Sequence, residues 1–227
     1  IHTALWLWSR NGFIDLDESI LNDEIFKNKI KESYENNKYI EDYRKRELLP
    51  FEKDIFDQVI SHLPANGNIL DLGCGSGYPY DRYFVDNKFN LTGVDFSRKH
   101  INQARKNNPN ATYIEGDIEK FEYTTNYHLI MMLFSLLHIP RDHHKEILTK
   151  IYNHLNDNGI LLLTLRDEDV GNFKYRNDFC GNDMYWSYYN YDEYIKILNE
   201  IGFKVLYSVN QNKFGISESH NWLILKK

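Results

Sequence analysis

The spacing of apolar residues changes near Gly67, and this change divides the chain into two patterns. From about residue 15 to residue 63, apolar residues recur at the intervals of an amphipathic helix. Three helices are predicted there: one that contains Ile20 to Ile30, one over Asn37–Leu48, and one that begins at Pro50. We therefore expect residues 1–62 to form an N-terminal helical cap.

After Gly67, short apolar runs alternate with helical stretches, which is typical of a parallel sheet covered by helices. The predicted strands are Asn68–Leu72, Asn90–Asp95, Ala111–Glu115, Tyr127–Leu133 and Gly159–Leu165. The predicted helices between them lie near Tyr78–Val85, Ser97–Asn107 and Arg141–Leu155. Right-handed crossovers then place helices on both faces of a doubly wound sheet.

A long aromatic and polar insertion over residues 166–189 interrupts this alternation. A helix is predicted after it, because Asn190 and Glu193 form a capping pair and Gly202 suits the end of a helix. Two further strands follow, Phe203–Asn210 and Asn221–Leu225, and their short connection makes them antiparallel.

These elements predict an α/β fold over residues 63–227 with a doubly wound, seven-stranded, mostly parallel sheet. Its last strand is expected to be antiparallel. The composition agrees with a globular chain, because 42% of the residues are hydrophobic and 26% are charged.

The strongest chemical signal is the run Asp71-Leu72-Gly73-Cys74-Gly75-Ser76-Gly77, which follows a buried strand and precedes a helix. Ligands of open α/β sheets bind at the carboxyl ends of the strands, where this loop is expected. Asp95 ends the next strand and is positioned to accept hydrogen bonds from ribose hydroxyls. Asp117 follows the third strand and could contact an adenine amine.

The glycine loop departs from the dinucleotide fingerprint, whose third glycine comes one position later. The carboxylate of Asp71 at the start of the loop would repel a pyrophosphate. It would attract a ligand that carries an ammonium group and a sulfonium. The charge therefore favours S-adenosylmethionine over a nicotinamide dinucleotide.

With Gly93-Val94-Asp95-Phe96-Ser97 and Glu115-Gly116-Asp117-Ile118, this loop resembles the class I, Rossmann-like S-adenosylmethionine-dependent methyltransferases. The resemblance runs from about Tyr39 to the C-terminus and includes Phe134-Ser135-Leu136-Leu137-His138 after the fourth strand. It also includes Asn156-Asp157-Asn158-Gly159, where Asn158 replaces a glycine and requires a turn that asparagine can adopt.

The resemblance implies a cofactor, S-adenosyl-L-methionine, whose product is S-adenosyl-L-homocysteine. It implies cofactor contacts from Asp71, Gly73, Gly75, Gly77, Asp95, Phe96, Asp117, Ile118, Leu133, Phe134 and Ser135. In similar enzymes an N-terminal helix adds a tyrosine and a basic residue, and the candidates here are Tyr39, Tyr43 and Arg46.

His138 is the candidate catalytic base, because it follows the fourth strand beside the expected methyl group and its ordinary pKa of ~6.5 suits proton transfer. A purely structural role for this histidine stays open. The neighbours His143 and His144 are expected to be solvated rather than metal ligands, since adjacent helical residues do not share a face. No metal is predicted.

Substrate contacts are expected from His138, from Arg166 at the end of the fifth strand, and from Trp186 and Tyr189 in the aromatic insertion. A solvated loop around Arg166 and plain packing of the aromatic residues stay open as alternatives. The acceptor is expected to be an oxygen or nitrogen atom of a small molecule.

The partners expected are this small molecule and no nucleic acid or membrane, with the chain as a monomer or homodimer. The net charge is −6 and the densest basic run, Arg44 to Arg46, is short. No apolar run approaches the ~20 residues that span a bilayer, and the two cysteines indicate a reduced, cytoplasmic protein. The alternatives are a tRNA or protein methyltransferase, a nicotinamide-dependent oxidoreductase and a non-catalytic cofactor-binding module.

Overall fold

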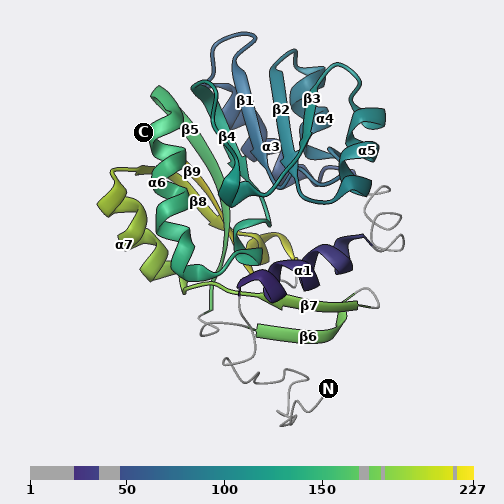
Figure 1. Cartoon of the computed structure of the whole chain (residues 1–227). Helices are drawn as coiled ribbons and strands as arrows, with labels where there is room; N and C mark the ends of the chain where they lie inside the picture. Colours follow the sequence, from purple (N-terminus) through teal and green to yellow (C-terminus); the bar gives the residue numbers. More distant parts are fainter. Residues whose placement is uncertain (1–22, 36–46, 169–173, 180–181, 217–218) are drawn as a thin grey trace, which may run out of the picture.

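The computed structural model describes residues 23–35, 47–168, 174–179, 182–216 and 219–227. A seven-stranded sheet forms its centre, in the order β3-β2-β1-β4-β5-β9-β8 (Figure 1). The strands are β1 Asn68–Leu72, β2 Asn90–Asp95, β3 Thr112–Glu115, β4 Tyr127–Met132, β5 Leu155–Arg166, β8 Lys204–Asn210 and β9 His220–Lys226.

The prediction of a doubly wound, mostly parallel sheet is confirmed. Strands β1 to β5 pair in parallel, whereas β9 lies between β5 and β8 and is antiparallel to both. The α-helices are α1 Asp23–Tyr34, α3 Pro50–Ile60, α4 Tyr80–Asp86, α5 Arg98–Asn107, α6 His144–His154 and α7 Tyr191–Ile201. Short 3-10 turns cover Ile118–Lys120, Leu136–His138, Arg141–His143 and Gln211–Phe214.

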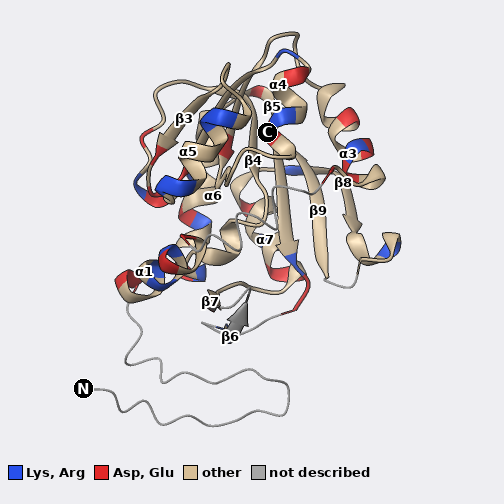
Figure 2. Ribbon diagram, turned by 90° about the vertical axis from the view of Figure 1, so that its right-hand side faces the viewer, with Lys and Arg blue, Asp and Glu red and all other residues tan. Residues whose placement is uncertain are grey.

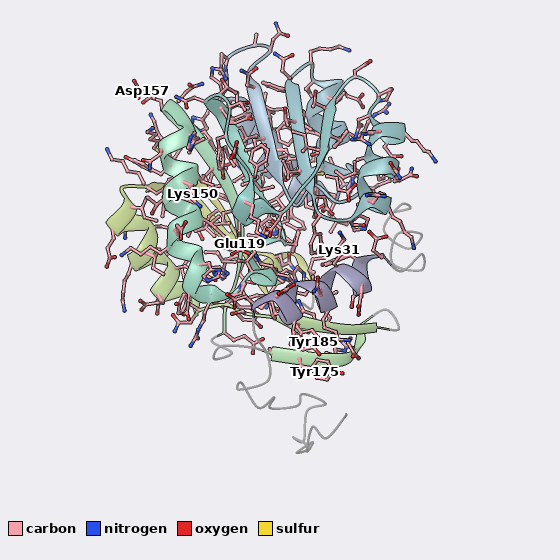
Figure 3. All side chains as sticks on the ribbon, viewed as in Figure 1. Lys31, Glu119, Lys150, Asp157, Tyr175 and Tyr185 are labelled. Carbon is pink, nitrogen blue, oxygen red and sulfur yellow. The ribbon has the colours of Figure 1, made fainter. Side chains whose placement is uncertain are left out.

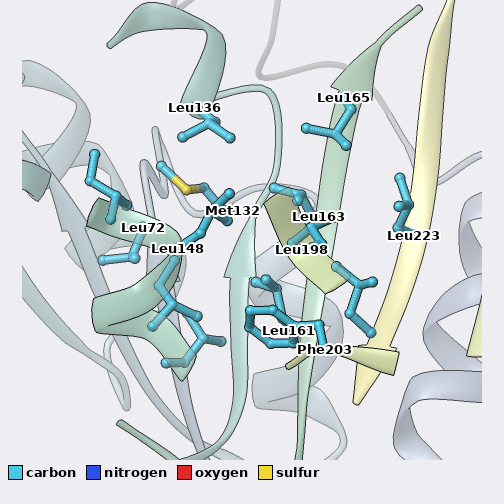
Figure 4. Packing of buried hydrophobic residues seen from close by; sticks show 14 of the residues in the cluster. Leu72, Met132, Leu136, Leu148, Leu161, Leu163, Leu165, Leu198, Phe203 and Leu223 are labelled. Carbon is cyan, nitrogen blue, oxygen red and sulfur yellow. The ribbon is translucent and has the colours of Figure 1, made fainter. Parts of the chain in front are cut away.

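Two hydrophobic clusters cover the two faces of the sheet. Helices α3, α4 and α5 pack on one face, and α6 and α7 pack on the other. Figure 4 shows the second cluster, in which Leu148 of α6 lies on the side of Leu72 and Met132, and Leu198 of α7 lies beside Leu163 of β5. Because apolar layers lie on both faces, the central strands are continuous apolar runs rather than alternating ones.

Several local predictions are confirmed at the residues that determine them. The Asn190 side chain accepts a hydrogen bond from the Glu193 backbone N–H, and Gly202 ends α7 in the left-handed region. Asn158 also has a positive φ of 62°, as its replacement of a glycine requires. β5 begins at Leu155, four residues earlier than predicted, immediately after α6.

The aromatic insertion contains a hairpin that the residue pattern did not indicate. Its strands are β6 Lys174–Phe179 and β7 Asn182–Trp186, which form a separate two-stranded sheet. Figure 1 shows α1 lying crosswise between this hairpin and the carboxyl edge of the main sheet. The predicted helix over 37–48 falls mostly outside the described residues.

The hairpin holds α1 through apolar contacts. Phe26 and Ile30 are fully buried against Tyr175, Met184 and Tyr185. Figure 3 shows Tyr175 and Tyr185 on the hairpin beneath α1. An N-terminal segment and a segment near residue 180 therefore form one structural unit over the edge where the strands end.

Both signs of charge occur on α1 and on α3, as Figure 2 shows. None of the helices in the described part of the chain has the length and apolar composition needed to cross a bilayer.

Candidate functional site

A cavity lies at the carboxyl ends of β1, β2 and β4, and residues of α1 complete its wall. The structure brings most of the predicted site residues together on its wall: Asp71, Gly73, Gly75, Asp95, Phe96, Asp117, Ile118, Leu133, Phe134, Ser135 and His138. Residues from four separate segments of the sequence therefore meet at this edge of the sheet, as the positions of the strand ends predict.

The start of the glycine loop is fixed by a close approach to the segment after β4. Gly73 has a φ of +89°, and a Cβ at this position would lie 2.3 Å from the Cβ of Ser135. Ser135 Oγ donates a hydrogen bond of 2.6 Å to the Leu72 carbonyl. This contact ties the ends of β1 and β4 together and leaves no space for a side chain at residue 73.

The centre of the loop faces open space. Gly75 has a φ of +53°, and a Cβ there would have no protein atom within 4 Å. Asp95 holds this turn in place, because its Oδ2 accepts a hydrogen bond of 3.0 Å from the Gly75 N–H and its Oδ1 accepts one of 2.9 Å from the Ser97 N–H. A carboxylate has further lone pairs, so Asp95 can also accept hydrogen bonds from a ligand.

Asp71 lies under the loop in a buried carboxyl pair with Asp81, the second residue of α4. Desolvation raises the pKa of both carboxyls, and the neighbouring charge of Asp81 raises the pKa of Asp71 further. Asp71 Oδ1 has no hydrogen-bond partner among the described residues, although Asp71 lines the cavity. A positively charged donor in the cavity would satisfy this oxygen and favour ionisation of the pair.

Helix α1 contributes two residues to the cavity that the sequence reading did not select, Lys27 and Tyr34. Lys27 Nζ lies 3.2 Å from Asp117 Oδ2 and also forms an ion pair with Glu119. Burial lowers the pKa of Lys27, but the two ion pairs outweigh it and raise the pKa above its usual value. Lys27 and Tyr34 are seven residues apart, and this spacing on one helical face was the available signal.

His138 forms a chain of hydrogen bonds with Tyr34 and the hairpin. Its Nε2 lies 2.6 Å from Tyr34 Oη, and its Nδ1 lies 3.1 Å from the Tyr185 carbonyl oxygen. A carbonyl can only accept, so Nδ1 carries the proton and Tyr34 donates to Nε2. Desolvation lowers the pKa of His138 to about 4, so the imidazole is neutral at physiological pH.

Other predicted site residues lie away from the cavity wall. Gly77 packs against Tyr113 behind the loop. Arg166 lies at the end of β5 beside His220, and the Tyr189 hydroxyl contacts Asp142. Trp186 contacts the ring of His138, with 6.3 Å between the centroids. The candidates Tyr39, Tyr43 and Arg46 lie outside the described residues.

The expectation that both His143 and His144 are solvated is wrong for His144. His144 is fully buried, where Nδ1 lies 2.7 Å from Tyr194 Oη and Nε2 lies 2.8 Å from the Ile139 carbonyl. His143 pairs with Glu119 at 2.5 Å. In the described part of the chain, no three side chains of metal-binding type are grouped as a metal site would need.

Comparison with known proteins agrees with this geometry. A family model described as a methyltransferase domain matches residues 69–159. A carboxy-S-adenosyl-L-methionine synthase of Campylobacter lari is 26% identical over 222 residues, which cover 83% of this chain and 94% of that protein.

Two solved structures share the fold at low sequence identity. Magnesium protoporphyrin IX methyltransferase from Synechocystis PCC 6803 has a TM-score of 0.66 at 14% identity, covering 89% of this chain and 99% of that chain. An amino pentose methyltransferase from Micromonospora echinaspora has a TM-score of 0.64 at 15% identity, covering 83% and 95%.

Residues 69–159 match the methyltransferase-domain family, and the described part of the chain has the fold of the class I, Rossmann-like S-adenosylmethionine-dependent methyltransferases. S-adenosylmethionine is the cofactor of this family. The wall of the cavity fits such a ligand in three respects: the unsatisfied Asp71 Oδ1, the open space at Gly75, and the lone pairs of Asp95. The carboxylates on the wall, which outnumber the single lysine there, favour a ligand with a positive charge.

Proposed function

We propose that this methyltransferase moves the methyl group of S-adenosylmethionine to an oxygen or nitrogen atom of a small molecule. One observation carries the proposal: the cavity joins a cation-favouring side, with Asp71 and Asp95, to a side with Tyr34 and His138. The first side suits the ammonium and ribose of the cofactor. The second side offers hydrogen-bonding groups to an acceptor.

The remaining assignments follow from this orientation. We assign Phe96, Ile118 and Leu133 to contacts with the adenosine, and Phe134 and Ser135 to the region around the sulfonium. Asp117 is already engaged by Lys27, so a hydrogen bond from Asp117 to the adenine amine would have to use its remaining lone pairs. Substrate contacts of Arg166 and Tyr189 stay predictions that this cavity does not support.

The chemistry requires alignment more than acid or base strength. The bound cofactor supplies an activated methyl group that is displaced in line by the acceptor. Holding the two reactants in that geometry can lower the activation free energy by ~7–11 kcal/mol. Leu133 and Phe134 give the cavity an apolar wall beside the loop, which would exclude water from the line of transfer.

Calorimetric titration with S-adenosylhomocysteine and, separately, with NAD tests the cofactor assignment. We expect saturable binding of the first and none of the second. Tight binding of NAD instead would contradict the proposal and favour an oxidoreductase.

Incubation with isotope-labelled S-adenosylmethionine and a small-metabolite extract tests the reaction, with tRNA and a protein extract as parallel acceptors. Mass spectrometry should find S-adenosylhomocysteine together with a labelled small molecule. Label in tRNA or protein would change the acceptor class. A carboxylated form of the cofactor would indicate the chemistry named for the Campylobacter lari relative.

Three further expectations stay predictions: the division between a cap over residues 1–62 and a catalytic domain over 63–227, the cytoplasmic location, and the monomeric or homodimeric state.

A further inference from the structure

We propose that Tyr34 and His138 form a proton relay for a hydroxyl acceptor, with Tyr34 as the residue that contacts the substrate hydroxyl. This inference rests on the proposed function and deepens it. It selects an oxygen nucleophile over a nitrogen one and places a residue of α1 among the catalytic residues.

The direction of the hydrogen bonds defines the relay. The Tyr185 carbonyl fixes the His138 proton on Nδ1, so Nε2 is an acceptor, and it lies 2.6 Å from Tyr34 Oη. Tyr34 therefore gives its proton to His138 and can accept a hydrogen bond from a ligand with the same oxygen. A donor in the cavity, such as a hydroxyl, meets Tyr34 rather than the imidazole.

The surrounding contacts hold both rings in place. The Tyr34 and His138 rings meet edge to face with centroids 5.2 Å apart, and Tyr34 also contacts the His100 ring at 5.6 Å. The adjacent turn of α1 is fixed to β7, where Ser33 Oγ donates to the Asp183 carbonyl. Such support keeps a catalytic group in a productive geometry.

Proton balance explains why the relay suits a hydroxyl. The acceptor oxygen forms the new O–CH₃ bond with a lone pair while the S–CH₃ bond breaks with its electron pair on sulfur. The hydroxyl proton passes to Tyr34 Oη as the Tyr34 proton passes to His138 Nε2. The products are a methyl ether, S-adenosylhomocysteine and a His138 imidazolium that later releases its proton to water.

An amine acceptor gains less from this arrangement. A neutral amine is nucleophilic without losing a proton, and its methylated product is a weakly acidic ammonium ion. A desolvated imidazole is a poor acceptor for that proton, whereas a protonated ether is a strong acid and transfers its proton readily. The buried imidazole of His138 is therefore basic enough to take up the proton that ether formation releases.

The first test uses the protein without cofactor. In ¹⁵N NMR spectra of the imidazoles, we expect His138 to be the Nδ1–H tautomer with a hydrogen-bonded Nε2. In Tyr34→Phe the tautomer should persist while the Nε2 resonance shifts toward that of an unbonded nitrogen. An Nε2–H tautomer in the wild-type protein would overturn the proposal.

The second test uses matched pairs of compounds, phenol with aniline and benzyl alcohol with benzylamine, and labelled S-adenosylmethionine. We expect methylation of the hydroxyl members and a fall in rate of about 100- to 10,000-fold in Tyr34→Phe. His138→Gln offers Tyr34 an amide oxygen but cannot take its proton, so it should lose activity to a similar degree. Methylation of the amines alone, or full activity of Tyr34→Phe, would refute the relay.

Tyr175→Phe is the matched control, since its hydroxyl bonds to Asp183 in the hairpin that supports α1 and does not line the cavity. This variant should keep the wild-type rate. Binding of S-adenosylhomocysteine separates the two proposals. If the wild-type protein does not bind it, the proposed function is contradicted. The tautomer measurement tests the hydrogen-bonded pair of Tyr34 and His138 independently of that result.

Discussion

The ring of Tyr113 occupies the space beside Gly93 where a side chain would otherwise lie. A Cβ at residue 93 would be 2.6 Å from Tyr113 Cε1 and 2.9 Å from the Cβ of Cys74. Gly77 has the same neighbour, since a Cβ there would lie 2.6 Å from Tyr113 Oη. These two glycines therefore accommodate a tyrosine that donates a hydrogen bond to Asp81 beneath the loop.

Gly93→Ala should destabilise the protein by about 1–3 kcal/mol, because the added methyl group meets a buried ring and must displace it. Chemical denaturation followed by circular dichroism measures the change in the free energy of unfolding. S-adenosylhomocysteine affinity should also fall, since movement of Tyr113 disturbs Asp81 and the loop.

Gly116→Ala is the control for this substitution. Its Cβ would lie 3.7 Å from Val94 and 4.0 Å from Ile114, which are ordinary contacts. We expect a change in stability within about 0.5 kcal/mol. Equal stabilities of the Gly93 variant and the wild-type protein would show that Tyr113 moves without cost.

The comparison of Gly75 with Gly93 shows where the sequence was sufficient. The strand-loop-helix pattern predicted a glycine facing a ligand, and Gly75 has this environment. Gly93 belongs to a second motif of the resemblance, yet the space beside it is filled by Tyr113 rather than left open for a ligand. A glycine in such a motif indicates that another group lies close to its backbone. The tertiary structure shows whether that group is a ligand or a protein side chain.

Strand order and the meeting of Asp71, Asp95 and Asp117 could be predicted, because alternating strands and helices permit few topologies. The roles of Lys27 and Tyr34 could not, because they depend on how α1 docks. This docking uses Phe26 and Ile30 against a hairpin about 150 residues away in the sequence, whose alternation is obscured by charged and polar residues.

The buried pair of Asp71 and Asp81 should make stability depend on pH. Both pKa values are raised in the folded state. Below the unfolded pKa of about 3.9 both carboxyls are protonated in the folded and unfolded states, so the pair does not lower the free energy of unfolding. As pH rises from there through the folded pKa values, ionisation favours the unfolded state and the pair becomes destabilising. Asp71→Asn removes one ionisable group from the pair. Its stability relative to the wild-type protein should therefore increase between pH 4 and pH 8, by about 1–3 kcal/mol.

Unfolding free energies at several pH values test this prediction. Asp57→Asn is a control of opposite sign, because hydrogen bonds from Lys53 and Tyr83 lower the pKa of exposed Asp57. Its stability relative to the wild-type protein should decline slightly as pH rises toward the unfolded pKa of about 3.9 and stay constant above it. A pH-independent difference between Asp71→Asn and the wild-type protein would mean that the carboxyl pair is solvated.

Asp95→Asn should weaken S-adenosylhomocysteine binding by about 1–3 kcal/mol, because a charged acceptor is lost. In the wild-type protein the two oxygens of Asp95 accept hydrogen bonds from the N–H groups of Gly75 and Ser97. The asparagine side chain has only one oxygen to accept them. The amide NH₂ would face one of these donors and loosen the turn. Calorimetric titration measures the affinity, and the unfolding midpoint shows whether the fold is intact.

Glu115→Gln is the matched control for Asp95, because Glu115 ends the neighbouring strand β3 opposite Asp95 and pairs with exposed Arg98. Its affinity for S-adenosylhomocysteine should stay at the wild-type value. Wild-type affinity in Asp95→Asn would contradict the assignment of Asp95 to the cofactor.

Tyr194→Phe should destabilise the contact between α6 and α7. Tyr194 Oη donates a hydrogen bond of 2.7 Å to His144 Nδ1, since the Ile139 carbonyl accepts from Nε2 and thereby fixes the tautomer. Removing the hydroxyl leaves a buried nitrogen without its donor, which costs about 1–3 kcal/mol. Tyr191→Phe, on the same helix, removes an exposed hydroxyl that contacts Ser208 and should change stability by less than about 0.5 kcal/mol. Denaturation of both variants distinguishes the two environments, and equal losses would show that water reaches His144.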